Sequence, residues 1–246
     1  VGPSVDRILS ILERHDAHGT FFTLGWIAER HPEIVKRILE GGHEIASHGW
    51  DHRRVTELEP DQFRNSVRRS KSVLEDLSGT PVRGFRAPSF SIVPGAEWAL
   101  DVLLEEGYAY DSSLFPVSRK GYGYSSGKRY PHWLELDGGQ LYEVPPTTLR
   151  RFGVNLPSAG GGYFRLLPYS LTRTALSDAE RQGERGTFYI HPWEIDPDQP
   201  RFDVSLPTRL RHYGGLARTQ TRLERLFSEF RFTSIAHTLN EHGRSG

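Results

Sequence analysis

Two spacings of apolar residues alternate along this chain, and each is typical of one kind of secondary structure. Near the start, Val5, Ile8 and Leu12 recur every three or four positions, which predicts an amphipathic helix that ends before Gly19. The next segment, residues 20–24, is β-branched and aromatic and predicts a buried strand. Because helical and strand-like segments continue to alternate, the pattern favours an α/β fold with a mainly parallel sheet.

The predicted helices carry an apolar stripe and cover residues 3–18, 26–40, 59–79, 95–106, 168–181 and 216–230. The predicted strands are short apolar or alternating segments at residues 20–24, 43–47, 82–85, 108–110, 133–136, 141–144, 187–190 and 232–235. The region from 116 to 166 is less regular and is rich in Gly, Ser, Tyr and Pro. Its three consecutive glycines, 160–162, lack the strand and helix of a phosphate-binding loop, so we interpret them as a turn or a close backbone approach.

A length of 246 residues fits one α/β barrel or one to two ordinary domains. No internal repeat and no long linker divides the sequence, so we predict a single domain spanning residues 1–246. A distorted (β/α) barrel is the favoured architecture, and an open doubly wound sheet is the alternative. The chain already begins with a helix and has no initiator Met, so we expect the first strand of such a barrel to lie upstream of Val1.

Composition narrows the function classes. Hydrophobic residues make up 36% of the chain, which is enough for a sizeable core. Lys plus Arg and Asp plus Glu are both 31, and this balance argues against non-specific binding to nucleic acid or to anionic membranes. No run approaches 18 apolar residues, so we predict no transmembrane segment. The absence of cysteine excludes disulfides, thiolate catalysis and thiolate metal sites.

Candidate metal ligands follow the predicted strand at residues 43–47. His48 and His52 are four positions apart, and a helical backbone there would place both imidazoles on one face. Imidazole suits zinc and similar divalent cations, and a catalytic site needs a third ligand and an open position. The simpler alternative is two solvated loop histidines, because an HxxxH pair alone has little specificity.

Three other predicted strands also end in residues capable of chemistry, namely Arg86, Asp111 and His191. In parallel barrels the carboxyl ends of the strands gather at one rim, where active sites lie. Each residue has a structural alternative as well: Arg86 as a surface or carbonyl contact, Asp111 as the start of a turn, and His191 as a packed loop residue. Their shared position at strand ends favours one common site.

These segments resemble the ordered motifs of the polysaccharide deacetylases, the family-4 carbohydrate esterases. SHGWDH (47–52) resembles the second motif, HxxxH, which supplies two metal-binding histidines. RAPSF (86–90) resembles the third, RxPxF/Y, and YDSSLF (110–115) resembles the fourth, DxxxW, with Phe115 where Trp is usual. YIH (189–191) resembles the fifth, LxH, with Ile in place of Leu. The order and spacing of these motifs cover most of the chain.

The resemblance implies a distorted (β/α) barrel and a metal-dependent hydrolase that removes N-acetyl groups from amino sugars of a polysaccharide. It implies that His48 and His52 hold zinc or a similar divalent cation, and that Arg86 orients a catalytic aspartate. It implies that His191 protonates the leaving amine and that Asp111 holds His191 and raises its pKa. The expected substrate contacts are the backbone of Ser89 and the side chains of Phe90, Phe115, Tyr163 and Trp193, although core packing is the simpler interpretation for any of these aromatic residues.

The first motif of the family, an aspartate-containing strand end, has no counterpart in this chain. It would supply the catalytic base and the third metal ligand, so we expect that the chain is N-terminally truncated and that activity belongs to the full protein. A narrower resemblance, through GGGYFRLLPY and YIHPWEIDP, is to deacetylases of bacterial exopolysaccharide loci linked to exosortase, on the cytoplasmic or periplasmic side. Two alternatives stay open: an allantoinase-like cyclic-amide hydrolase of the same fold, and a non-catalytic glycan-binding or assembly protein.

Overall fold

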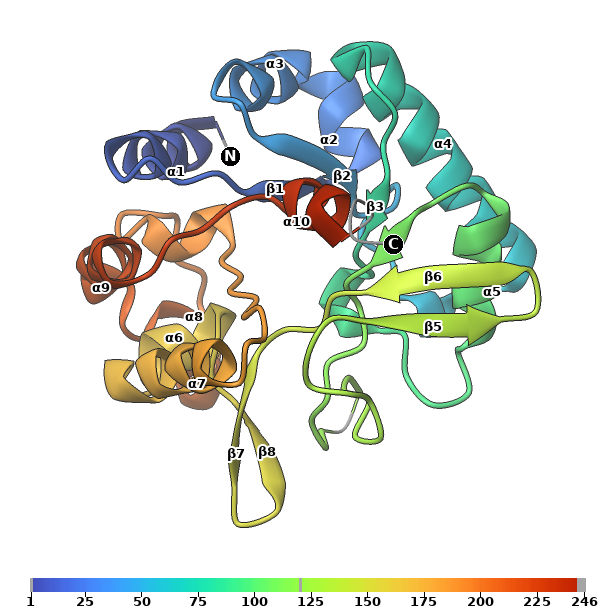
Figure 1. The fold of residues 1–246 in the computed structure, drawn as a ribbon. Coiled ribbons are helices and arrows are strands. Elements are labelled where there is room, and N and C mark those ends of the chain that lie inside the picture. The colour runs from blue at the N-terminus through green and yellow to red at the C-terminus, as the bar shows by residue number, and fades with distance from the viewer. Residues whose placement is uncertain (1, 120, 243–246) are drawn as a thin grey trace. The chain divides into compact units, whose positions relative to one another are not determined.

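The computed structural model describes residues 2–119 and 121–242, which form two compact units. The first, here called the sheet unit, consists of His18–Pro145 and Thr233–Gly246. The second, here called the helical unit, consists of Val1–Ala17 and Pro146–Phe232. Both units are therefore built from two separate stretches of chain, coloured from blue to red in Figure 1.

The sheet unit contains a six-stranded sheet with the order β1-β2-β3-β4-β6-β5. Its strands are β1 (Thr20–Thr23), β2 (Glu44–Ser47), β3 (Gly84–Phe85), β4 (Tyr110–Asp111), β5 (His132–Leu136) and β6 (Gly139–Glu143). All neighbours are parallel except β5, which pairs antiparallel with β6. The predicted α/β fold with a mainly parallel sheet is confirmed. Within the described residues, however, hydrogen bonds leave β1 and β5 at the two edges, so they do not close the sheet into the predicted barrel.

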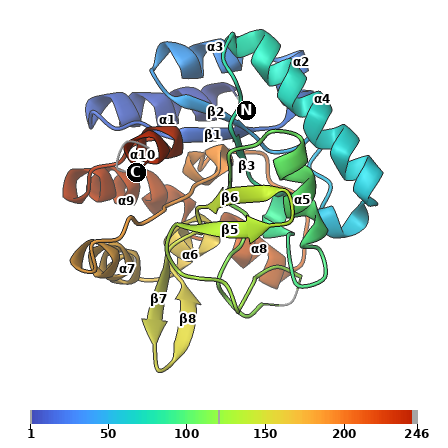
Figure 2. The ribbon, with the colours of Figure 1, turned by 45° about the vertical axis from the view of Figure 1, so that its right-hand side comes forward.

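Helices cover this sheet, and their sequences explain where they begin and end. They are α2 (Gly25–Arg30), α3 (Pro32–Glu40), η1 (Val55–Glu57), α4 (Pro60–Ser78), η2 (Pro88–Phe90), α5 (Trp98–Glu105) and α10 (Ile235–His242). Figures 1 and 2 show α3 and α4 beside β2, and α5 beside the β5–β6 pair. We predicted one helix over residues 26–40, but Pro32 cannot donate a backbone hydrogen bond and starts a new helix instead.

The C-terminal segment corrects another prediction. We expected a strand at residues 232–235, but Ile235 is the first residue of α10. The backbone N–H of Ile235 donates to Thr20 Oγ1 (2.9 Å), and that of Ala236 donates to Glu44 Oε2 (2.9 Å). Polar side chains of β1 and β2 thus satisfy the first donors of the helix, which an N-terminus otherwise leaves unpaired.

Close packing around Tyr110 forms part of the core of the sheet unit. The Tyr110 ring is fully buried and packs with Tyr142, Val144 and Leu239. Its hydroxyl donates to Glu44 Oε1 at 2.7 Å. A β-carbon on Gly84 would lie only 1.9 Å from this ring, so the absence of a side chain at position 84 makes room for it.

The helical unit combines helices with one hairpin. Its elements are α1 (Gly2–Arg14), β7 (Thr148–Arg151), β8 (Val154–Pro157), α6 (Gly161–Leu166), α7 (Tyr169–Arg181), η3 (Pro192–Ile195), α8 (Leu206–Tyr213) and α9 (Leu216–Glu229). The predicted strand at 187–190 is wrong, because only Tyr189 forms a bridge, to Gly160. At Gly160, φ is 143° and a β-carbon would lie 2.2 Å from the Tyr189 carbonyl oxygen, so the predicted close backbone approach is confirmed. No helix among the described residues is long and apolar enough to cross a membrane.

Candidate active site

The two candidate metal ligands lie on the loop that follows β2. This loop is not helical, and left-handed backbone at Gly49 (φ 76°) and His52 (φ 64°) turns it instead. The rings of His48 and His52 nevertheless meet, with centroids 5.3 Å apart and planes 72° apart. The convergence that we expected from helical spacing is therefore produced by a bend.

The geometry of this pair fits a shared divalent cation. His48 Nδ1 lies 2.6 Å from the carbonyl oxygen of Arg86, and because a carbonyl can only accept, Nδ1 must donate. The neutral ring then has its lone pair on Nε2, in the arrangement that positions metal-binding histidines. Two imidazoles bound tetrahedrally to one zinc, with Zn–N distances of 2.0–2.1 Å, would have centroids about 5 Å apart. In the described part of the chain, no third His, Cys, Asp or Glu joins the pair in a potential metal-binding group.

Arg86 connects this histidine loop to the neighbouring strands. Its Nε donates to the Ser112 carbonyl (3.0 Å) and its Nη2 donates to Ser112 Oγ (2.6 Å). Ser112 Oγ in turn donates to the carbonyl of Val144 at 2.5 Å. The carboxyl ends of β2, β3, β4 and β6 are therefore joined by one hydrogen-bonded series that runs from His48 to Val144. The guanidinium also lies 4.2 Å from the centroid of the Phe22 ring.

The loop after Arg86 has an unusual backbone. Ser89 (φ 57°) and Phe90 (φ 52°) are consecutive non-glycine residues in the left-handed region. Such conformations cost of order 1 kcal/mol each and persist only where the surroundings enforce them. One such constraint is the N–H of Ala87, which donates to Ser113 Oγ at 2.8 Å. Ser89 is exposed and Phe90 is half-buried, so both lie near solvent at this end of the sheet.

Asp111 and Glu143 are two buried acids that pair across β4 and β6, next to this loop. Asp111 is fully buried, and its two oxygens accept from the N–H (3.0 Å) and the hydroxyl (2.6 Å) of Ser113. Glu143, opposite it on β6, is also fully buried. Burial raises the pKa of Asp111, and burial together with the charge of Asp111 raises the pKa of Glu143 well above its ordinary value. Through Ser113, Asp111 holds the loop that begins with Arg86.

Phe115 requires a correction. We expected its ring to line a sugar or acetyl pocket, but the side chain is only 1% exposed. It packs against Phe90, with centroids 5.2 Å apart, and against Tyr122, 6.2 Å away. Burial of a large apolar ring stabilises the fold, so Phe115 belongs to the core.

His191 lies in the helical unit, where its hydrogen-bond partner is Glu194. Its Nδ1 donates to Glu194 Oε2 at 2.9 Å, and its backbone N–H donates to the same oxygen at 3.0 Å. The family resemblance implied such a role for Asp111, which belongs to the sheet unit, and that role stays a prediction. Glu194 reaches His191 because Pro192 starts the 3₁₀ turn η3, and Glu194, the third residue of that turn, folds back onto the N-cap residue His191.

Arg165 is a second residue that sequence reasoning missed. It is 2% exposed, and its Nε donates to Glu194 Oε1 at 2.7 Å. The signals in the sequence are the i,i+3 spacing of His191 and Glu194 and an arginine on the apolar helix α6. Burial tends to raise the pKa of Glu194, but hydrogen bonds from His191 and Arg165 outweigh it and hold the pKa below its ordinary value.

Two predicted substrate contacts, Trp193 and Tyr163, also belong to the helical unit. The ring of Trp193 lies between two imidazoles, with centroids 5.9 Å from His191 and 4.4 Å from His212. Tyr163 is half-buried in α6. Whether either side chain touches a substrate stays a prediction.

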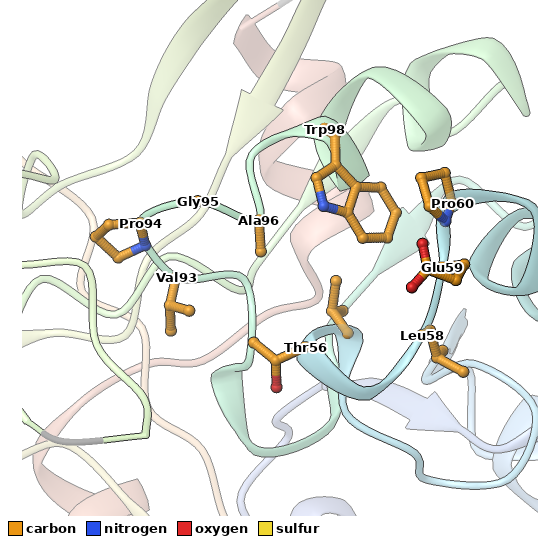
Figure 3. Close-up of a pocket in the computed structure, with 10 residues that line it drawn as sticks. Thr56, Leu58, Glu59, Pro60, Val93, Pro94, Gly95, Ala96 and Trp98 are labelled. Atoms are coloured by element: carbon orange, nitrogen blue, oxygen red, sulfur yellow. The ribbon is translucent and has the colours of Figure 1, made fainter.

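A hollow of about 320 Å³ lies on the sheet unit, between η1 and the segment that leads into α5. Its lining combines the indole of Trp98, the carboxylate of Glu59 and the side chain of Thr56 with prolines and small apolar residues (Figure 3). Both walls continue the loops that carry the candidate site. One wall begins at Val55, three residues after His52, and the other begins at Val93, three residues after Phe90. The N–H of Val55 donates to Ser91 Oγ at 2.9 Å and joins the two walls.

Comparison with known protein families gives a match for each of two segments of the chain. Residues 2–101 match the family model described as polysaccharide deacetylase, and residues 112–240 match a domain of unknown function, DUF3473. The chain therefore carries a DUF3473 domain over about half of its length, and the segment before that domain matches the polysaccharide deacetylases. The resemblance seen in the sequence is therefore confirmed at the level of this family of carbohydrate esterases, whose members are generally metal-dependent hydrolases.

Similar proteins of described activity include two bacterial enzymes. A peptidoglycan-N-acetylglucosamine deacetylase from Bacillus cereus is 34% identical over 104 residues, which is 41% of this chain and 38% of the relative. A peptidoglycan-N-acetylglucosamine deacetylase from Listeria monocytogenes is 30% identical over 112 residues, which is 41% of this chain and 24% of the relative. The chain thus spans well under half the length of either relative.

Solved structures show the same fold over nearly the whole chain. A Mycobacterium smegmatis protein described as a polysaccharide deacetylase superposes with a TM-score of 0.67 at 24% identity and covers 98% of this chain and 77% of its own. An allantoinase superposes with a TM-score of 0.64 at 18% identity, covering 95% and 70% of the two chains. A pseudoenzyme of the CE4 family from Bacillus anthracis gives 0.52 at 16% identity, covering 96% and 60%. At these identities, the likeness concerns the fold alone.

Proposed function

We propose that this protein is a metal-dependent hydrolase that removes N-acetyl groups from the amino sugars of a bacterial polysaccharide and releases acetate. The observation that carries the proposal is the hydrogen-bonded edge of the sheet, where Arg86 fixes the ring of His48 beside that of His52. The match of residues 2–101 to the polysaccharide deacetylase family supports the reaction type.

In this proposal, the residues of the sheet unit bind and orient. Nε2 of His48 and the ring of His52 would hold the cation, because Nδ1 of His48 is engaged by the Arg86 carbonyl. A divalent cation such as zinc would polarise the acetyl carbonyl and lower the pKa of a water molecule towards neutrality. The positive charge of Arg86 would orient the catalytic base, which in the family is the aspartate of the first motif. Asp111 supports this arrangement through Ser113 and the loop of Arg86.

Two further roles complete the proposed reaction. The backbone N–H of Ser89, on its exposed left-handed turn, stabilises the oxyanion that forms on the acetyl oxygen. His191 donates the proton that the leaving amine needs, as the resemblance of YIH to the fifth family motif implies.

The hollow beside η1 is the proposed place for a second sugar of the same glycan. Its volume of about 320 Å³ suits one sugar ring, and pockets for small molecules typically combine an apolar wall with a few polar groups. The indole of Trp98 offers such a wall, and Glu59 and Thr56 offer polar groups (Figure 3). The proposed substrate is therefore a polymer, and we favour an exopolysaccharide over the peptidoglycan on which the B. cereus and L. monocytogenes relatives act.

The deciding experiment measures bound metal and released acetate together, with this chain and with the product of the complete reading frame. His48→Ala and His52→Ala should each lose metal and acetate release in parallel, because each removes a ligand. The matched control is His31→Ala, since His31 is an exposed histidine whose ring contacts the surface residue Glu33. Metal content that is unchanged in both site variants would reject the assignment of these ligands.

The same assay separates the alternatives. Ring opening of allantoin without acetate release would favour a cyclic-amide hydrolase. Glycan binding without acetate release by the complete product would favour a non-catalytic protein.

The hollow predicts a dependence on glycan length. For the wild type, kcat/KM should rise from a single N-acetylglucosamine to longer oligomers. Trp98→Ala should lower it by about two- to twelvefold for long oligomers, from an aromatic contact of about 0.5–1.5 kcal/mol, and leave the monosaccharide unaffected. Trp133→Ala, at a tryptophan that is 47% exposed on β5, is the control. Equal losses for the short and the long substrates would contradict a role in glycan binding.

A further inference from the structure

We propose that Glu194 is the residue that positions His191 for proton transfer, and that Arg165 holds Glu194 in place. This role of Glu194 rests on the proposed function, in which His191 acts as the acid. The proposal gives a carboxylate of the helical unit the role that the family resemblance had given to Asp111.

The contacts of Glu194 determine which nitrogen of His191 can act. One oxygen, Oε2, accepts both from the backbone N–H of His191 (3.0 Å) and from Nδ1 of its ring (2.9 Å). A carboxylate can only accept, so Nδ1 carries a hydrogen and is committed to this contact. The proton that passes to the leaving amine must therefore leave from Nε2. In enzymes that use histidine, a carboxylate on one ring nitrogen sets the tautomer and orientation of the ring in this way.

Arg165 explains why Glu194 stays in this position. Both side chains are almost completely buried, at 2% and 0% exposure, and Nε of Arg165 donates to Oε1 of Glu194 at 2.7 Å. The other guanidinium nitrogens donate to the carbonyls of Gly214 (2.6 Å) and Arg211 (3.0 Å). With the two hydrogen bonds from His191, five hydrogen bonds thus immobilise the two charges, and a buried pair is stable only when its remaining donors are satisfied.

Stacking fixes the remaining freedom of the His191 ring. The ring of Trp193 lies nearly parallel to it, at an interplanar angle of 20°, and the Arg165 guanidinium lies 4.9 Å from the Trp193 centroid. His191 itself is 49% exposed in its side chain, so a buried acid–arginine pair supports a ring that solvent and substrate can reach. This combination suits a positioned proton donor better than a purely structural ion pair.

The test uses Glu194→Gln in the product of the complete reading frame. This variant keeps the shape of the side chain and removes its charge. We expect kcat for acetate release to fall about 10- to 100-fold, with KM within about twofold. In the His191→Ala background, the same change should cost nothing further, because the two residues act as a unit. Glu229→Gln is the matched control, since it also breaks contacts to two arginines of the helical unit, Arg173 and Arg225.

Nitrogen-15 NMR of the ring provides a measurement that needs no activity. Neutral wild-type His191 should carry its hydrogen on Nδ1, and Glu194→Gln should lower the population of that tautomer. A wild-type ring protonated mainly on Nε2 would overturn the proposal, whether or not the variant folds. An equal loss of kcat from Glu194→Gln with and without His191 would also overturn it. If His191→Ala keeps normal turnover, the acid role in the proposed function fails, and the NMR result still decides whether Glu194 orients the ring.

Discussion

At the scale of single residues, hydrogen bonds position the candidate side chains of His48, Arg86 and His191. His48 and Arg86 were recognisable because they follow apolar strands, and the structure joins them by one hydrogen bond. Glu194 was overlooked because it follows a proline in what was expected to be a loop. The turn that Pro192 starts brings Glu194 back onto His191, and this i,i+3 spacing is the signal that would have found it.

The buried acids Asp111 and Glu143 give a prediction for the pH dependence of stability. The raised pKa of Glu143 means that the folded chain binds this proton more tightly than the unfolded chain does. The resulting stabilisation is complete below the ordinary carboxyl pKa of about 4.3 and is lost as pH rises through the raised value. Glu143→Gln removes this titration, so its free energy of unfolding should decline less between pH 4 and pH 8. Urea unfolding across this range measures the effect.

The control for this measurement is Glu135→Gln, because Glu135 is exposed on β5. The control should follow the wild-type pH curve. A Glu143→Gln curve parallel to the wild type would show that Glu143 is not the titrating group.

At the scale of secondary-structure elements, long helices with an apolar stripe were predictable and short elements were not. The predicted helices at 59–79, 168–181 and 216–230 correspond to α4, α7 and α9. The hairpin β7–β8 and the helices α6 and α8 were missed. The helix α8 has no buried residue, so its sequence lacks the apolar stripe that would predict a helix packed on a core. The strands β3 and β4 are two residues long, and pairing with their neighbours defines them more than any local pattern does.

The contact between β3 and β4 gives a prediction at this scale. Gly84→Ala should destabilise the protein by about 1–3 kcal/mol or more, because the added β-carbon would overlap the immobile Tyr110 ring. Thermal or urea unfolding measures this loss. Gly138→Ala is the control, since its β-carbon would meet only a Leu104 methyl at 3.4 Å. Equal stability of the two variants would mean that the Tyr110 ring can move aside.

At the scale of the whole molecule, the sequence predicted the fold class but not the division of the chain. The alternation of helices and strands implied a parallel sheet, and the sheet is present. Local patterns contain no information about which distant segments join. They did not show that the C-terminal segment returns to the sheet unit as a helix, or that the first helix belongs with residues 146–232.

The return of the C-terminal helix predicts a large effect far along the chain. Leu239 of α10 is 6% exposed and packs with Tyr110, Tyr142 and Val144, residues about 100 or more positions earlier. Leu239→Ala should therefore cost about 2–5 kcal/mol of unfolding free energy. Leu210→Ala, at a helical leucine that is 60% exposed, should change it by no more than about 0.5 kcal/mol. A small effect at Leu239 would show that α10 contributes little to the sheet unit.

The division of the helical unit between both ends of the chain affects how the protein is made on the ribosome. Arg7 of α1 donates to the carbonyl of Ile195, which is 188 residues later. At about 5–20 residues per second, α1 emerges roughly 10 to 40 seconds before that partner is synthesised. During this interval the apolar stripe of Val5, Ile8, Ile11 and Leu12 has no native surface to cover it. The nascent chain should therefore be a client for chaperones that shield such stripes until translation has passed the second half of the unit.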